Sequence, residues 1–181
     1  MMQFIITPAA GKRMIAKSIV KDAEIQDVLK SGTIIVVAGT TNGYVAEELL
    51  ASIGQAEGFS RDRFFRGIVP PAGDANEMGQ IADRSGFPGD VVINHGKWEQ
   101  GKTIFDAVDE LKAGDIIIKG ANAINAARNQ VGILIGDPAC GTGLAAFRAS
   151  VGKKVRLFFP AGLEKRVEND INDLAALMND P

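Results

Sequence analysis

Residues 131–147 read Val-Gly-Ile-Leu-Ile-Gly-Asp-Pro-Ala-Cys-Gly-Thr-Gly-Leu-Ala-Ala-Phe, an apolar run that leads through a glycine-rich turn into a helix-like stretch. Glycines let a ligand approach the backbone closely, and the first N–H groups of the following helix point at that ligand. The same order recurs upstream, where Thr33–Ala38 leads through Gly39–Gly43 into Tyr44–Leu50. These two glycine-rich turns, Gly39–Gly43 and Asp137–Gly143, predict a pocket for a phosphorylated or carboxylated small molecule.

Short runs rich in β-branched residues alternate with amphipathic stretches that suit helices. The runs are apolar almost throughout, as parallel strands covered on both faces usually are. We therefore expect a single α/β domain with a doubly wound, Rossmann-like, mostly parallel sheet of about six strands and helices on both faces. In it, residues 1–32 form a leading strand or helix, and residues 33–181 form the sheet and its covering helices. The expected strands are Thr33–Ala38, Phe64–Val69, Asp90–Ile93, Asp115–Lys119, Val131–Ile135 and Lys154–Phe159, and helical patterns cover Lys12–Lys30 and Leu163–Met178.

The composition excludes several classes of protein. The 181 residues are 46% apolar, enough for one core, and the 20 basic against 22 acidic residues include no basic cluster of the kind that binds nucleic acid. No apolar run approaches the roughly 18 residues of a membrane span, and no charged region precedes an apolar one at the start of the chain. We expect a cytoplasmic protein without nucleic-acid or membrane partners. With one histidine and one cysteine, we also expect no metal and no resident cofactor.

Candidate ligand-binding residues follow the expected strands, at the edge where open α/β sheets hold ligands. A lysine at that edge can pair with a phosphate. For every candidate an ordinary role stays open as well: Asn42 or Thr41 could cap a helix, and a lysine there could be solvated. The candidates are Gly39, Thr40, Thr41, Asn42, Gly43, Lys97, Lys119, Asn122, Gly141, Thr142 and Gly143.

Three further residues are candidates for acid and base chemistry: His95, Asp137 and Cys140. Cys140 lies at the expected start of a helix, where the helix dipole favours a thiolate. Its alternative role is that of a small buried apolar residue. His95 follows an expected strand and could contact a ligand or lie in a partly exposed loop.

The segment Asp137–Gly143 also resembles the cofactor-binding motif of adenine-specific DNA methyltransferases, in which an acidic residue and a proline precede Ala-Cys-Gly and another glycine. The resemblance implies binding of S-adenosylmethionine and methyl transfer. Those enzymes need a long sheet after this motif and an Asn-Pro-Pro-aromatic catalytic motif. Here the only Pro-Pro pair, Pro70-Pro71, follows Val69, and little chain remains after Gly143. Methyl transfer is therefore an alternative function rather than the leading one.

Longer stretches resemble the superfamily that contains ribose-5-phosphate isomerase, glucosamine-phosphate deaminase and CoA transferases. Methylthioribose-phosphate isomerase and the regulatory subunits of initiation factor 2B are also members. Gly11–Lys17, Ser31–Gly43 and Glu47–Leu50 are similar to its leading helix, first strand and phosphate-binding Gly-Thr-Gly-Ser-Thr turn. In this chain Asn42-Gly43 replaces the Ser-Thr pair of that turn.

The second half of the chain is similar to methylthioribose-phosphate isomerase over Lys119–Ile124, Gly141–Ala146 and Val155–Pro160. Asn122 stands at the position of that family's catalytic aspartate, and Ala139-Cys140 replaces its lysine before the Gly-Thr pair. The resemblance implies binding of a small phosphorylated metabolite, a sugar phosphate or a nucleotide, in a chain that forms a homo-oligomer. If the chain is an enzyme, the implied reaction is isomerisation of a sugar phosphate by proton transfer. Because an asparagine cannot take up a proton as a carboxylate does, a non-catalytic metabolite sensor or regulatory subunit is the alternative.

Overall fold

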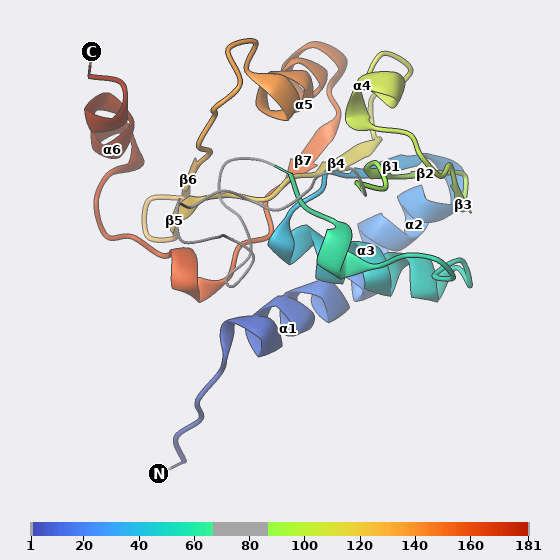
Figure 1. The fold of residues 1–181 in the computed structure, drawn as a ribbon, viewed down its shortest axis with the longest axis horizontal. Coiled ribbons are helices and arrows are strands. Elements are labelled where there is room, and N and C mark those ends of the chain that lie inside the picture. Colours follow the sequence, from blue (N-terminus) through green and yellow to red (C-terminus); the bar gives the residue numbers. More distant parts are fainter. Residues whose placement is uncertain (1, 67–86, 181) are drawn as a thin grey trace.

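A five-stranded mixed sheet lies at the centre of the computed structural model, which describes residues 2–66 and 87–180 (Figure 1). The strand order is β3-β2-β1-β4-β7. β1 pairs in parallel with β4, and β4 with β7, whereas the β1–β2 and β2–β3 pairs are antiparallel. The strands are β1 (Thr33–Val36), β2 (Val91–Asn94), β3 (Lys97–Trp98), β4 (Ile116–Ile118) and β7 (Arg156–Phe158).

The expected doubly wound, mostly parallel sheet of about six strands is therefore wrong. Apolar runs indicate that a strand is buried on both faces, but they carry no information about its direction. β2 is as apolar as β1 and β4, yet it runs antiparallel to β1 and returns through a tight hairpin at His95-Gly96. Both hairpin residues have positive φ, 48° and 74°, which suits a two-residue connection between antiparallel strands.

A separate two-stranded antiparallel sheet takes up part of the run expected as the strand Val131–Ile135. It consists of β5 (Ala123–Asn125) and β6 (Gln130–Gly132). Beyond β6, Ile133–Ile135 form no strand, and Leu134 and Ile135 are exposed. The run therefore does not enter the main sheet, although the helix expected after it is present.

Helices cover both faces of the main sheet, as expected. α1 (Pro8–Lys21), α2 (Ala23–Ser31) and α3 (Thr40–Ser52) lie below the sheet in Figure 1, and α4 (Ile104–Ala107) and α5 (Gly141–Lys153) lie above it. Successive side chains of β1 point to opposite faces of the sheet, so each face has its own hydrophobic core. Ile34 and Val36 belong to one core, and Ile35 belongs to the other.

Two expected helices are divided by aspartates that cap a new helix. Within Lys12–Lys30 the backbone of Asp22 is extended, and its Oδ1 accepts hydrogen bonds from the N–H groups of Glu24 and Ile25, at 3.0 and 3.2 Å. Within Leu163–Met178 a 3-10 turn (Leu163–Lys165) is followed by α6 (Ile171–Met178), which Asp170 caps. A capping side chain outweighs a continuous apolar stripe at these positions, because it satisfies N–H groups that the helix start leaves free.

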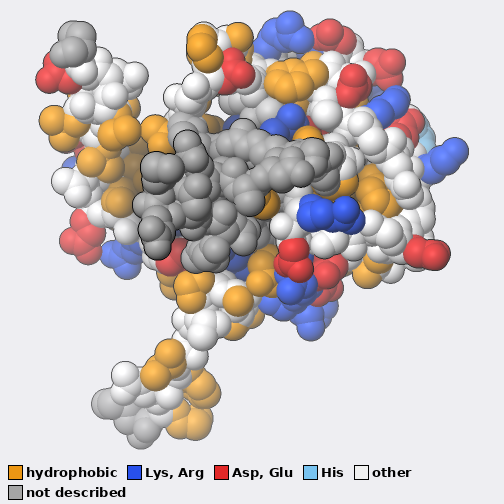
Figure 2. Space-filling view, viewed as in Figure 1, with side chains coloured by type: hydrophobic (Ala, Val, Ile, Leu, Met, Phe, Trp, Pro, Cys, Tyr) orange, Lys and Arg blue, Asp and Glu red, His pale blue; other side chains and the backbone are white. Residues whose placement is uncertain are grey.

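The strand expected at Phe64–Val69 and the leading segment before α1 also differ from the expectation in their described residues. Phe64–Arg66, the first part of the strand expected at Phe64–Val69, form no strand and follow a 3-10 turn (Arg61–Arg63), and residues 67–69 lie outside the described residues. Residues 2–7 precede α1 without forming a strand, and Met2, Phe4 and Ile5 are 77–93% exposed. Figure 2 shows hydrophobic side chains on this N-terminal extension, at the bottom of the view. Among the described residues, no helix combines the length and the hydrophobicity needed to cross a membrane.

Candidate functional site

A cleft of about 820 Å³ opens where the parallel strands β1 and β4 end. Both glycine-rich turns contribute to its walls, so the structure brings together two segments about a hundred residues apart in sequence. Within residues 2–66 and 87–180, three basic residues and one acidic residue line it. The lining includes Gly39, Thr40, Thr41, Arg66, Phe105, Lys119, Gly120, Asn122, Asp137, Cys140, Gly141, Thr142, Gly143 and Lys165.

Two helices begin at this cleft, and no side chain in the described part of the molecule caps either of them. α3 starts after Gly39 and α5 after Cys140, and neither first turn carries an acidic residue. The other four α-helices have capping side chains at their N-termini, from Thr7, Asp22, Thr103 with Asp106, and Asp170. The first N–H groups of α3 and α5 are therefore free to bind an anion from the cleft.

The three basic side chains differ in their partners. The guanidinium of Arg66 forms an ion pair with Asp90 and lies over the rings of Phe87 and Phe105, at 5.1 and 5.5 Å from their centroids. Nζ of Lys165 donates a hydrogen bond to the carbonyl oxygen of Ala121 at 2.5 Å. Nζ of Lys119 has no hydrogen bond or ion pair with any described residue.

Burial shifts the pKa values of several charged groups in and below the cleft. Burial lowers the pKa of Lys119 most, and the positive charge of Arg66 lowers it further. The negative charge of Asp90 opposes this shift, and the charge of Lys165 adds a smaller lowering effect. Burial also lowers the pKa of Lys165. The pKa of Asp90 is raised by burial, although Arg66 and two backbone N–H groups favour its charged form.

Asp90 positions the strand ends beneath the cleft. It is 1% exposed, and its two carboxylate oxygens accept hydrogen bonds from the N–H groups of Ala38 (2.9 Å) and Ile104 (2.7 Å). It also holds Arg66 at the wall of the cleft. Sequence reasoning missed Asp90, Arg66 and Lys165, because each lies in a segment that was assigned only to a strand or a helix.

Asn42 and Gly43 belong to the scaffold and do not line the cleft. Asn42 is fully buried, and its Nδ2 donates to the carbonyl oxygens of Val37 (2.7 Å) and Ile118 (3.0 Å), which ties the end of β1 to the end of β4. A Cβ at Gly43 would lie 3.0 Å from Cβ of Arg61, so this glycine allows close packing. Thr41, 2% exposed, does line the cleft, and its Oγ1 has no hydrogen-bond partner among the described residues.

The second glycine-rich turn is held by its own side chains. Oδ1 of Asp137 accepts a hydrogen bond from the N–H of Ala139 at 2.7 Å. Cys140 and Gly141 both have positive φ, 60° and 44°, and the cysteine is exposed. Oδ1 of Asn122 accepts from the N–H of Leu134 at 2.9 Å, so it positions the segment that leads to this turn.

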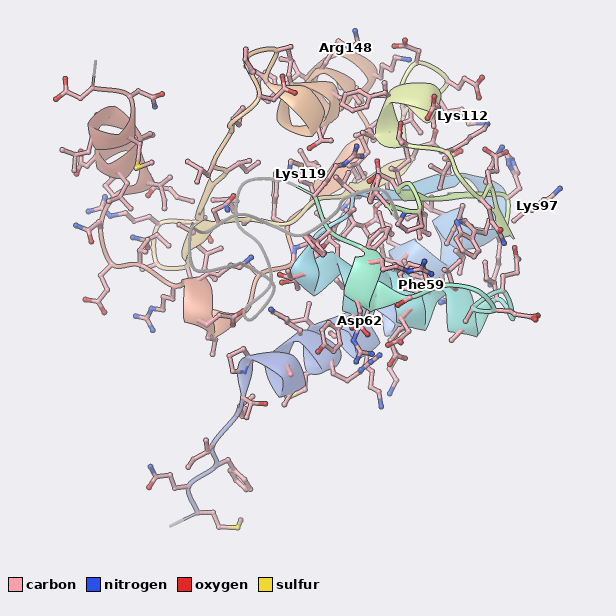
Figure 3. All side chains as sticks on the ribbon, in the orientation of Figure 1. Phe59, Asp62, Lys97, Lys112, Lys119 and Arg148 are labelled. Atoms are coloured by element: carbon pink, nitrogen blue, oxygen red, sulfur yellow. The ribbon has the colours of Figure 1, made fainter. Side chains whose placement is uncertain are left out.

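His95 and Lys97 are not at the cleft. Because β2 is antiparallel to β1, the end of β2 lies at the start of β1, where Asn94 pairs with Thr33. Figure 3 shows Lys119 near the middle of the molecule and Lys97 at its right-hand edge. His95 is exposed and its Nδ1 lies 2.6 Å from Oδ1 of Asn94. The expectation that His95 and Lys97 share an edge with the glycine-rich turns is wrong, since it assumed a parallel β2.

The arrangement is suited to holding an anion beside the half-buried amine of Lys119. Among residues 2–66 and 87–180, no group of three or more His, Cys, Asp or Glu side chains is placed to hold a metal ion. The chain matches no family model, no curated protein and no solved structure. Its site must therefore be interpreted from its own geometry.

Proposed function

We propose that this chain binds a small phosphorylated metabolite, a sugar phosphate or a nucleotide, in the cleft at the ends of β1 and β4. The observation that carries the proposal is that two uncapped helix N-termini, of α3 and α5, meet three basic side chains on one cleft. Free N–H groups at helix starts and fixed cations both favour a negatively charged ligand.

The charge and size of the cleft favour a phosphate over a single carboxylate. Among the described residues of the lining, the three basic side chains of Arg66, Lys119 and Lys165 outnumber the one acidic side chain, that of Asp137. A volume of about 820 Å³ lies within the range of pockets that enclose a small metabolite. The phosphate would contact the two helix starts, and the remainder of the molecule would lie along Phe105 and Ile135, which supply apolar wall.

The resemblance to phosphate-binding isomerases gives this proposal additional support, because the similar segments Gly39–Gly43 and Gly141–Gly143 both contribute to the cleft. The geometry favours binding of a phosphorylated metabolite over methyl transfer. After Asp137–Gly143 the main sheet gains only β7, whereas the methyltransferases that the motif resembles continue into a long sheet.

Calorimetric titration tests the proposal directly. We expect inorganic phosphate to bind weakly and at least one member of a panel of sugar phosphates and nucleotides to bind more tightly, with heat that falls as salt is added. S-adenosylmethionine serves as the comparison for methyl transfer. If no phosphorylated compound binds at millimolar concentration, the proposal is wrong.

Two glycines allow a steric version of this test. A Cβ built at Gly39 or Gly120 meets no described atom within 4 Å, and neither residue has a φ in the left-handed region that favours glycine. We expect Gly39→Ala and Gly120→Ala to fold with a cost below about 1 kcal/mol, while each new methyl group weakens phosphate binding by about tenfold or more. Gly152→Ala, exposed near the end of α5, is the matched control and should leave binding unchanged. Unchanged affinity in both cleft variants would place the ligand elsewhere.

A further inference from the structure

The side chain of Lys119 differs from those of the other two basic residues of the cleft in its contacts with the described residues. Arg66 is held by Asp90 and lies over two aromatic rings, and Nζ of Lys165 is bonded to the carbonyl oxygen of Ala121. Nζ of Lys119 has neither a hydrogen bond nor an ion pair within residues 2–66 and 87–180. We propose that Lys119 is a nucleophile that forms an imine with the carbonyl carbon of a phosphorylated aldehyde or ketone bound in the cleft.

The position of Lys119 fits this role. It directly follows β4, and its backbone N–H donates to the carbonyl oxygen of Phe158 at 2.9 Å, so the residue is fixed where β4 meets β7. Its side chain lines the cleft between the two glycine-rich turns. A ligand whose phosphate contacts the starts of α3 and α5 would therefore have the rest of its carbon chain within the cleft that Lys119 lines. This inference rests on the proposed binding of a phosphorylated metabolite.

The surroundings of Lys119 favour the neutral amine that the reaction needs. Burial lowers its pKa, and the charges of Arg66 and Lys165 act in the same direction. Desolvation and a neighbouring cation are the two ways in which proteins activate a lysine as a nucleophile. Lys97, in contrast, is exposed.

The proposed step is balanced without a further reactant. The lone pair of neutral Nζ attacks the carbonyl carbon, so that an N–C bond forms and the C–O double bond becomes a single bond. The oxygen then leaves as water with the two protons of the amine, and a C=N bond remains. Protonation of this imine makes the adjacent C–H bond more acidic than it is beside the carbonyl.

Reductive trapping tests the inference on the full chain. Sodium cyanoborohydride transfers hydride to an imine and converts it into a stable secondary amine, whose position peptide mass spectrometry identifies. We use glyceraldehyde 3-phosphate and glyceraldehyde as a matched pair of probes with and without the phosphate. We expect one adduct, on Lys119, that forms about tenfold or more faster with the phosphorylated probe, and we expect excess inorganic phosphate to slow it.

Two variants, one at Lys119 and one control at Lys97, test whether the adduct depends on Lys119. Lys119→Arg keeps the positive charge but cannot form an imine, so it should lose the adduct. Lys97→Arg, at the opposite edge of the sheet, should be labelled at the rate of the unsubstituted chain. Adducts spread over surface lysines at similar rates, or a single adduct on another residue, would overturn the inference.

The same experiments separate this inference from the proposed function. If calorimetry shows that phosphate binds but no adduct forms on Lys119, the inference fails and the proposed binding stands. If phosphate binds to neither the chain nor Lys119→Arg, the proposed binding fails. Equal labelling of Lys119 by both aldehydes overturns the claim that the substrate is phosphorylated. Because the adduct is mapped on the unsubstituted chain, the test holds even if Lys119→Arg folds poorly.

Discussion

Asn42 joins the two strands that form the floor of the cleft. Its buried Nδ2 donates to carbonyl oxygens at the ends of β1 and β4, the chain segments from which the cleft opens. The sequence presented Asn42 as a ligand-binding or capping residue, because an asparagine in a glycine-rich turn suits either role. Only the position of Ile118 across the sheet shows that the amide is used within the fold.

Replacing Asn42 by aspartate should therefore be costly. A carboxylate of the same shape cannot donate to two carbonyl oxygens, and its burial there without a donor is unfavourable. We expect Asn42→Asp to lower the free energy of unfolding by about 3 kcal/mol, measured by urea denaturation.

Asn122→Asp is the matched control for that substitution. Asn122 is exposed, and it uses its Oδ1 as an acceptor for the N–H of Leu134, which a carboxylate oxygen can replace. We expect a change in unfolding free energy below about 0.5 kcal/mol. Similar losses in both variants would show that the buried donor of Asn42 is not important.

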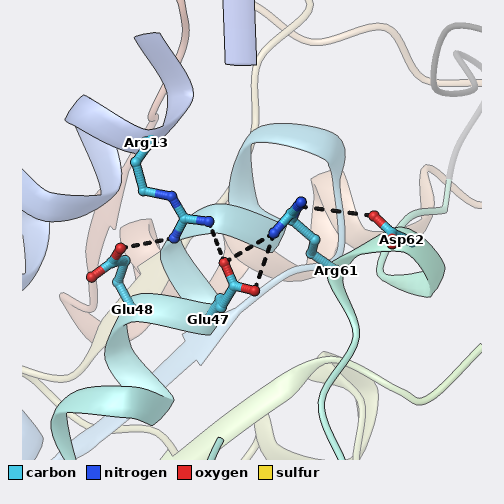
Figure 4. Close-up of polar contacts among 5 residues, drawn as sticks. All are labelled: Arg13, Glu47, Glu48, Arg61 and Asp62. Carbon is cyan, nitrogen blue, oxygen red and sulfur yellow. Dashed lines mark hydrogen bonds and ion pairs between the residues drawn. The ribbon is translucent and has the colours of Figure 1, made fainter. Parts of the chain in front are cut away.

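At the scale of elements, α3 is held against α1 by a network of ion pairs, which Figure 4 shows. Glu47 forms ion pairs with both Arg13 and Arg61, and Arg13 also pairs with Glu48 at 2.8 Å. The two guanidinium groups lie 4.8 and 4.9 Å from the centroid of the Tyr44 ring. Glu47 is therefore the shared counterion of two arginines that the ring brings close together.

We expect Glu47→Gln to lower the free energy of unfolding by about 1–2 kcal/mol, because it leaves those two cations near each other without their shared carboxylate. Added salt should reduce the difference from the unsubstituted chain, since screening weakens partly exposed pairs. Thermal denaturation at low and high ionic strength measures both effects. Glu57→Gln, an exposed glutamate after the same helix, should have almost no effect. A loss of equal size there would attribute the change to net charge instead.

At the scale of the whole molecule, stability and phosphate binding should respond to alkaline pH in opposite directions. The folded chain has a lowered pKa at Lys119 and at Lys165, so it binds fewer protons than the unfolded chain between those pKa values and the ordinary lysine value of 10.5. Stability rises with pH wherever the unfolded state binds more protons. Phosphate affinity should fall over the same window, because Lys119 loses its charge.

Urea unfolding and phosphate titration at a series of pH values up to 10.5 measure the two trends. The contribution of Lys119 is isolated by comparison with Lys119→Met, which keeps the length of the side chain and cannot titrate. We expect the rise in stability with pH to be smaller in this variant, and its phosphate binding to be weaker and less dependent on pH. Parallel curves for the two chains would contradict the lowered pKa of Lys119.

The local pattern of the sequence was sufficient to predict part of the fold and part of the site. β1, β4 and β7 lie within three of the expected strands, and α3 and α5 begin in the expected glycine-rich turns. These predictions succeed because periodicity, glycine and capping depend on residues close together in the chain. The helix divisions at Asp22 and Asp170 were missed, although they too are local, because the apolar stripes were given more weight than the caps.

By itself, then, the sequence determined two units in which a glycine-rich turn begins a helix, the first of them directly after strand β1. Only the tertiary structure decided that the two units share one cleft, that Arg66, Asp90 and Lys165 belong to it, and that His95 and Lys97 do not. The reason is that strand direction and pairing depend on contacts between segments far apart in the chain. Because β2 is antiparallel to β1, its end lies at the opposite edge of the sheet from the ends of β1 and β4. The residue pattern of Val91–Asn94 does not indicate this direction.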